Sequence, residues 1–221
     1  MEPTTENTNF IIKAFIDGGP VPMTVIAVLG LMALYIIVDR AFKLGSLILN
    51  KREFSEQIFR MVISGDVRQA ISFCDSRPAP LSNTVKAGLI QALNKRPDEE
   101  VQVAMDAAII REMPKLEGGV SFLAVFGNLA VLAGLLGTIL GMIISFGSIA
   151  AEVDPALKGI KLAAGISHAL NCTAFGLSVA LISSLAYGYF QHRIQKTENE
   201  MVETSMSLLN LVVSNRNKIK E

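Results

Sequence analysis

Residues 118–151 read GGVSFLAVFGNLAVLAGLLGTILGMIISFGSIAA, a run of 34 residues without a charged side chain. About 20 apolar residues in a helix cross a bilayer, and a chain in hydrocarbon must satisfy its backbone polar groups internally. The run therefore predicts a membrane-spanning helix that is longer than one crossing needs. Two more uncharged stretches, 18–38 with 21 residues and 162–192 with 31, predict two further spans.

The composition excludes several classes of protein. The chain has 221 residues, of which 51% are hydrophobic and 18% charged, against roughly 25% charged in soluble domains. Its 20 basic and 20 acidic side chains cancel, so there is no sign of nucleic-acid binding. Its two cysteines and two histidines have no metal-ligand spacing. With no phosphate-binding loop and no nucleophile elbow either, we expect no metal, no cofactor and no enzyme activity.

The predicted fold is an all-α membrane protein with three transmembrane helices, whose long second and third helices extend into a cytoplasmic helical bundle. The expected order is a periplasmic segment 1–19, transmembrane helix 1 at 20–38, a cytoplasmic helical segment 39–117, long helix 2 at 118–151, a periplasmic link 152–161, transmembrane helix 3 at 162–192 and a cytoplasmic C-terminal helix 193–221. Within the segment 39–117, the first helix is expected to continue past Arg40 to about Ser64.

The orientation follows from the basic residues. Twelve of them lie in 39–117, including Arg40, Lys43, Lys51 and Arg52 just after the first span. Cytoplasmic loops carry an excess of Lys and Arg, so this segment is expected inside, the N-terminus outside and the tail inside. The tail carries an apolar stripe that is expected to pack on its own bundle or on sister subunits: Ile194, Met201, Leu208 and Val212.

Small residues follow one face of each of the last two spans. Small side chains let membrane helices approach closely, so matching faces predict tight packing within one subunit or around a ring. The positions expected to pack are Gly134, Gly137, Gly141 and Ser145 in the second span, and Gly165, Ala169, Gly176 and Ala180 in the third.

Polar side chains in the spans give the candidate ion path, with Thr138 in the second span and His168 and Thr173 in the third. Polar groups in a bilayer usually face a bundle interior or water. A lone membrane Thr also bonds its own helix backbone as a structural residue, and an interfacial histidine competes with a proton relay at His168. No Asp or Glu lies inside any span, so a titrating carboxylate would have to come from another chain.

Several motifs occur together in one order. They are Gly18-Gly19-Pro20, Asp39-Arg40, Gly65-Asp66, the run Gly134-Leu135-Leu136-Gly137-Thr138-Ile139-Leu140-Gly141-Met142, and the run Ala169-Leu170 to Thr173-Ala174-Phe175-Gly176-Leu177. With them the chain resembles the MotA/TolQ/ExbB proton-channel family, closest to its three-span TolQ and ExbB branch.

The resemblance implies a subunit of a bacterial inner-membrane stator. It implies a homo-pentamer around a dimer of a single-span partner resembling ExbD, TolR or MotB, whose membrane aspartate carries the ion. The threonines matching Thr138 and Thr173 would face that aspartate in a pore within membrane lipid. His168 stands where the branch commonly has Glu, and we expect it to tune the pore and not to carry the ion.

Two other functions remain as alternatives. A non-conducting membrane scaffold that assembles a partner would keep the small faces but would not need Thr at both 138 and 173. A small-solute transporter would be expected to show internal repeats and interrupted helices, and the sequence has neither. Whether H⁺ or Na⁺ flows, and which machine is driven, are left open by the sequence.

Overall fold

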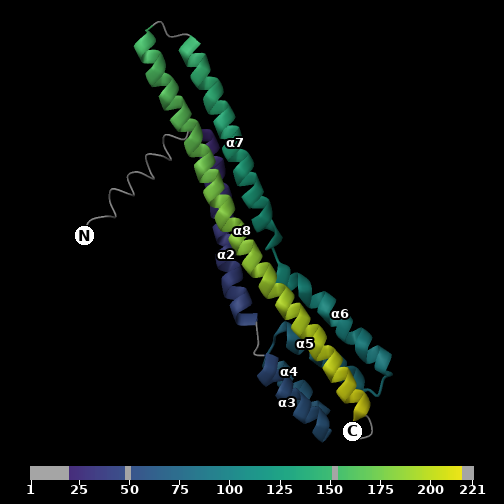
Figure 1. Ribbon diagram of the computed structural model, residues 1–221. Helices are drawn as coiled ribbons and strands as arrows, with labels where there is room; N and C mark the ends of the chain where they lie inside the picture. Colours follow the sequence, from purple (N-terminus) through teal and green to yellow (C-terminus); the bar gives the residue numbers. More distant parts are fainter. Residues whose placement is uncertain (1–19, 48–50, 151–153, 216–221) are drawn as a thin grey trace, which may run out of the picture. The chain divides into compact units, whose positions relative to one another are not determined.

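The computed structural model describes residues 20–47, 51–150 and 154–215, so the predicted segment 1–19 and the start of the link at 152–161 lie outside the described residues. The described chain is helical and contains no strand (Figure 1). Its helices are α2 (Pro20–Leu47), α3 (Lys51–Ser64), α4 (Val67–Ser76), α5 (Pro80–Leu93), α6 (Asp98–Glu117), α7 (Ser121–Ala150) and α8 (Pro155–Ser214).

Three helical stretches are long and apolar enough to cross a membrane: Val21–Gly45, Asp98–Ala150 and Leu157–Ser214. The all-α fold with three candidate spans, and with long helices toward the C-terminus, is therefore confirmed. The third predicted helix and the predicted C-terminal helix form one continuous helix of 60 residues, α8. Where one helix is expected to run from the first span to Ser64, the structure describes two helical stretches, α2 and α3, and residues 48–50 between them lie outside the described residues.

The chain divides into two compact units. Unit 1 comprises residues 1–38 and 119–188, and unit 2 comprises residues 39–118 and 189–221. Unit 1 contains most of α2, all of α7 and the first part of α8. Unit 2 contains the end of α2, α3 to α6 and the last part of α8.

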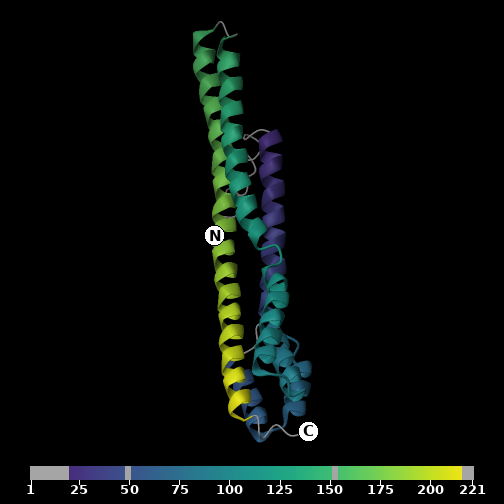
Figure 2. The same cartoon turned by 90° about the vertical axis from the view of Figure 1, so that its right-hand side faces the viewer.

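In unit 1, α7 and the first part of α8 lie side by side (Figures 1 and 2). The first turns of α2 join them through a small apolar cluster of Met23, Ile26 and Cys172, all at most 2% exposed. Gly30 continues the contact further along α2, since a Cβ there would lie 3.3 Å from Val179. The outward faces of these helices carry large exposed apolar side chains, as expected for helices surrounded by lipid or by other membrane helices.

In unit 2, α3 to α6 form a bundle around an apolar core. Every third or fourth residue of each helix turns inward, so that Phe54, Ile58 and Val62 of α3 are each at most 1% exposed. The tail stripe of α8 is buried within the same unit, with its four residues at most 1% exposed. Among them, Met201 brings its sulfur 3.6 Å from the hydroxyl of Thr84 on α5.

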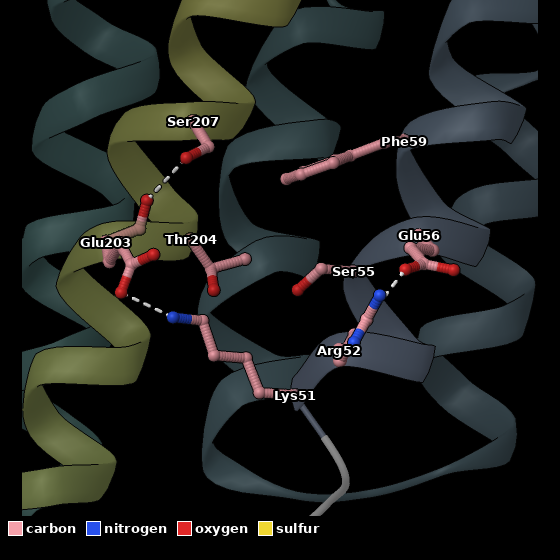
Figure 3. Close-up of a pocket in the computed structure, with 8 residues that line it drawn as sticks. All are labelled: Lys51, Arg52, Ser55, Glu56, Phe59, Glu203, Thr204 and Ser207. Carbon is pink, nitrogen blue, oxygen red and sulfur yellow. Dashed lines mark hydrogen bonds and ion pairs between the residues drawn. The ribbon is translucent and has the colours of Figure 1, made fainter.

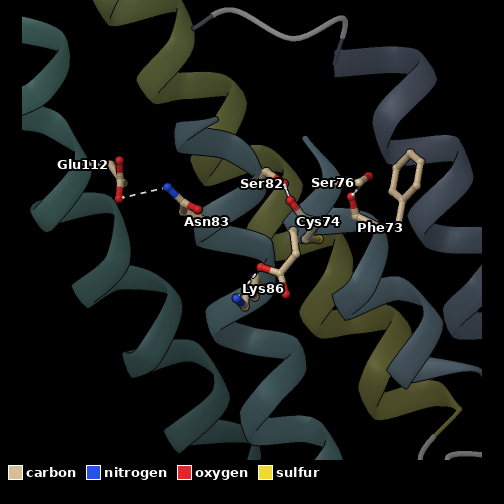
Figure 4. A network of polar contacts seen from close by, with 8 residues as sticks. Phe73, Cys74, Ser76, Ser82, Asn83, Lys86 and Glu112 are labelled. Carbon is tan, nitrogen blue, oxygen red and sulfur yellow. Dashed lines mark hydrogen bonds and ion pairs between the residues drawn. The ribbon is translucent and has the colours of Figure 1, made fainter. Parts of the chain in front are cut away.

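Polar contacts fix α4, α5 and α6 to one another (Figure 4). The Ser82 hydroxyl donates to the carbonyl of Cys74 at 2.9 Å, and Lys86 pairs with Asp75. Asn83 Nδ2 donates to Oε1 of Glu112 at 3.2 Å, which ties α5 to the last turns of α6. These bonds hold the bundle in register because each joins a buried or half-buried group to a neighbouring helix.

A polar cavity of about 340 Å³ separates α3 from the last part of α8 (Figure 3). Lys51 pairs with Glu203 across it. The hydroxyls of Ser55 and Thr204 line it and have no hydrogen-bond partner among the described residues. This side of the bundle is therefore joined less completely than the α4–α6 side.

Candidate functional site

One of the two predicted ion-path threonines, Thr173, bonds across the seam between α7 and α8 to the helical turn that precedes the other, Thr138. Thr173 Oγ1 of α8 donates across the seam to the carbonyl oxygen of Gly134 on α7 at 3.3 Å. In an α-helix the same carbonyl accepts the backbone N–H four residues later, which here is that of Thr138. The two threonines are thus joined through one backbone carbonyl of α7.

The hydroxyl protons of both threonines are engaged. Thr138 Oγ1 donates to the carbonyl of Leu135 in its own helix at 2.6 Å, and Thr173 Oγ1 donates to Gly134. Both side chains are half-buried. A hydroxyl that donates its proton still has lone pairs to accept a hydrogen bond or to ligate a cation, so the pair presents two oxygens as acceptors.

Glycines allow this approach. A Cβ at Gly134 would lie 3.0 Å from the carbonyl oxygen of Cys172 and 3.2 Å from Cα of Thr173. A Cβ at Gly176 would lie 2.5 Å from the carbonyl oxygen of Ala130. Larger residues would therefore push the helices apart and lengthen the Thr173 bond.

The same close approach continues toward the other end of α7. A Cβ at Gly141 would lie 3.1 Å from Cβ of Ala169, and one at Gly165 would collide with Oγ of Ser145. Ser145 is itself fixed by donating to the carbonyl of Gly141 at 2.7 Å.

At the opposite end of the seam, a Cβ at Gly127 would lie 3.6 Å from the carbonyl oxygen of Ala180. In the described chain the predicted packing positions thus lie at the contact between α7 and α8 of one subunit, with Gly137 against Cys172.

Thr138 also borders a hollow on the side of α7. This open hollow of about 520 Å³ is lined by Thr138, Ile139, Met142, Ile143 and Phe146. Thr138 supplies the one hydroxyl among four apolar side chains. A single acceptor in an apolar wall can take a hydrogen bond from one donor, such as a protonated carboxyl group.

His168 lies on α8 near Thr173 but on a different side of the helix. Five residues separate them, which corresponds to about 140° around the axis. His168 is half-buried and precedes Ala169, which is 2% exposed against α7. The structure therefore links Thr173 to the turn of α7 before Thr138 and places His168 on another side of α8.

Sequence reasoning missed Cys172 as a packing residue. Its side chain is 0% exposed and lies between Gly137 of α7 and the Met23 and Ile26 side chains of α2. It therefore fixes the turn of α8 that carries Thr173. The available signal was its position next to that threonine and opposite a glycine of the α7 stripe.

Comparison with known proteins places the chain among membrane transport proteins. Residues 76–203 match the model of the MotA/TolQ/ExbB proton channel family. The Tol-Pal system protein TolQ of Pseudomonas aeruginosa is 40% identical over 95 residues, which cover 43% of this chain and 40% of TolQ. This chain thus spans less than half of that relative.

Two more relatives match over longer stretches. A biopolymer transport protein ExbB homolog of Methanothermobacter thermautotrophicus is 26% identical over 198 residues, 88% of this chain and 67% of the homolog. A biopolymer transport protein named ExbB-like 3 of Synechocystis sp. is 26% identical over 161 residues, 73% of this chain and 76% of that protein.

Proposed function

Because the chain belongs to the MotA/TolQ/ExbB proton channel family, we propose that it is the ion-conducting stator subunit of a motor in the bacterial inner membrane. In this proposal it couples a proton or sodium motive force to mechanical work through a single-span partner resembling ExbD, TolR or MotB. Five copies surround two partner helices, and Thr138 and Thr173 line the ion path.

The joined threonines are the observation that carries the proposal. Both oxygens keep lone pairs free while their protons are committed to backbone carbonyls. No Asp or Glu lies in the three uncharged stretches, so the chain itself holds no carboxylate to carry a proton through the membrane. A partner carboxylic acid facing two acceptor oxygens supplies the missing group.

The orientation proposed for the chain is N-terminus in the periplasm and C-terminus in the cytoplasm. It rests on the twelve basic residues of 39–117. Unit 2 is then cytoplasmic, and the link at 152–161 is periplasmic. Neither the family nor the fold distinguishes outer-membrane import from envelope maintenance or gliding.

Thr138→Val and Thr173→Val test the ion path, because valine keeps the shape of threonine and removes the acceptor. The matched control is Thr24→Val on α2, where the hydroxyl also bonds its own helix, to the carbonyl of Val21 at 2.8 Å. Each variant is co-purified with its single-span partner and reconstituted into liposomes carrying a pH-sensitive dye. A second set of liposomes carries a sodium gradient.

We expect both seam variants to lose ion flux at least tenfold while native mass spectrometry still shows five copies with two partner chains. Thr24→Val should conduct normally. Normal flux in both seam variants would place the ion path elsewhere. A chain that remains monomeric or dimeric in gentle detergent would contradict the ring.

A non-conducting scaffold is the second candidate, and one observation favours it. Each threonine hydroxyl already has a backbone partner, as a purely structural Thr would. In that case wild-type liposomes show no flux of either ion, and the valine variants change only thermal stability.

A further inference from the structure

Arg40 makes a contact that ties two distant parts of the sequence together. It lies near the end of α2, and its side chain is 11% exposed. Its Nη1 donates to the carbonyl oxygen of Lys115 in the last turn of α6 at 3.2 Å. Its Nε lies 3.5 Å from Oδ2 of Asp39, which in turn accepts an ion pair from Lys43 at 2.7 Å.

The carbonyl of Lys115 is one that the helix cannot satisfy. The last four carbonyls of an α-helix have no partner within the helix, and a cation at this end also opposes the negative pole of the helix dipole. The backbone N–H of Gly118 donates to the carbonyl of Pro114 at 3.0 Å. Arg40 donates to the following carbonyl, that of Lys115, so a side chain of α2 caps the end of α6.

The guanidinium group also fills the space above the junction between α6 and α7. A Cβ at Gly118 would collide with Nη2 of Arg40 and lie 2.8 Å from its Cζ. Gly119 follows with φ of +90°, which favours glycine. Nothing lies within 4 Å of where its Cβ would be. The junction therefore consists of two glycines, of which the first is covered by Arg40 and the second is open.

The junction is held on its other side as well. Glu112, one turn earlier in α6, is 2% exposed, accepts from Asn83 of α5 at 3.2 Å and pairs with Lys115 at 2.7 Å. The last turn of α6 is thus fixed to α5 through Glu112 and to α2 through Arg40. The chain passes from unit 1 to unit 2 just before Arg40, between Val38 and Asp39, and from unit 2 to unit 1 between Gly118 and Gly119.

We propose that Arg40 is a positioning residue that clamps the last turn of α6, and with it the glycine junction that leads into α7, to the end of α2. A pair of glycines alone would let α7 rotate or slide relative to α6, because glycine leaves the backbone free. With the clamp, the turn that precedes α7, the helix that carries Thr138, is held at the end of α2. The consequence for ion flux rests on the proposed function; the clamp itself does not.

The test compares Arg40→Gln with Lys43→Gln in the full chain assembled with its partner. Both variants remove one positive charge next to the first span, and Lys43 pairs with Asp39 of its own helix at 2.7 Å. Hydrogen exchange is followed at the backbone amides of 118–123. We expect exchange there to accelerate about tenfold in Arg40→Gln and to stay unchanged in Lys43→Gln.

Two further variants test whether the effect comes from the contact of the Arg40 guanidinium group with the α6–α7 junction. Arg40→Lys keeps a donor that can reach the carbonyl, and it should restore most of the protection and most of the flux. Gly118→Ala places a methyl group where the guanidinium lies and so displaces it. Since Arg40→Gln and Gly118→Ala remove the same contact, the double variant should exchange no faster than the faster single variant.

The outcomes separate the clamp from the ion path. Unchanged exchange in Arg40→Gln, equal acceleration in Lys43→Gln, or additive effects in the double variant would each overturn the clamp. Faster exchange with wild-type ion flux would overturn its positioning role while leaving the ion path intact. Loss of flux in Thr173→Val reports on the proposed function whether or not the clamp exists.

Discussion

Replacing Gly176 by alanine tests the contact on which the threonine seam depends. The added Cβ would lie 2.5 Å from the carbonyl oxygen of Ala130, which is 0.9 Å inside the 3.4 Å at which ordinary contact begins. The obstacle is backbone and not the end of a flexible side chain, so α7 and α8 must separate. Overpacking of this kind costs about 1–3 kcal/mol, partly offset by the roughly 1 kcal/mol that alanine gains over glycine in a helix.

We therefore expect Gly176→Ala to lower the free energy of unfolding by up to about 2 kcal/mol. The matched controls are Gly188→Ala in the same helix and Gly147→Ala in α7, where nothing lies within 4 Å of the added Cβ. They should be neutral or more stable by up to about 1 kcal/mol. Unfolding is measured by SDS titration in mixed micelles, and ion flux is measured alongside it.

The two measurements should change together in Gly176→Ala. Separation of the helices lengthens the 3.3 Å bond from Thr173 to Gly134, so flux should fall while the pentamer persists. Equal stability for Gly176→Ala and the two controls would refute the close packing. A loss of stability with full flux would show that the bond across the seam is dispensable for conduction.

Two other side chains give predictions of opposite kind. His168→Gln should keep most of the ion flux, because glutamine still donates and accepts hydrogen bonds and His168 lies away from the Thr173 contact; a dead His168→Gln beside a healthy Thr173→Val would make His168 the relay. Burial raises the pKa of the Cys74 thiol from 9.0 to about 11, so at pH 8 only about one thiol in a thousand is ionised, and iodoacetamide should alkylate Cys74 at least about 100-fold faster in denaturant than in the folded chain. The same raised pKa predicts a contribution to stability that is complete below about pH 9 and is lost as the pH rises toward 11, because the unfolded thiol releases its proton first.

Much of the membrane part could be predicted because one physical requirement determines it. A bilayer excludes charge, so three uncharged stretches already indicate three helices, and the structure confirms them. Small residues spaced three and four apart also identify a helix face without a structure. Gly134 and Gly176 indeed lie where α7 and α8 approach most closely.

The remaining features depend on which helices contact one another in the folded chain. The spacing of apolar residues along the sequence does not predict those contacts. Apolar residues continue at helical spacing from α2 into α3, and their spacing does not predict which other helices each of the two contacts. Arg40 was read as a marker of orientation, because its acceptor on Lys115 lies 75 residues away. The residue type of Cys172 gives no sign that its side chain packs between α7 and α2.

The arrangement of donors and acceptors limits what the seam can bind. The hydroxyls of Thr138 and Thr173 donate hydrogen bonds to backbone carbonyls of α7. The hydroxyl of Ser145 also donates to a carbonyl of α7. A deprotonated carboxylate would therefore meet oxygen lone pairs and no donor, which is unfavourable in a low-dielectric site. A protonated carboxyl group could donate to one of the threonine oxygens, and a sodium ion could accept a lone pair from one of them. In the proposed motor the partner acid is consequently stabilised at this seam when it is protonated or paired with a cation, and it is disfavoured when it is bare. That difference between loaded and unloaded states is what a cycle needs if ion flow is to move the partner past the ring.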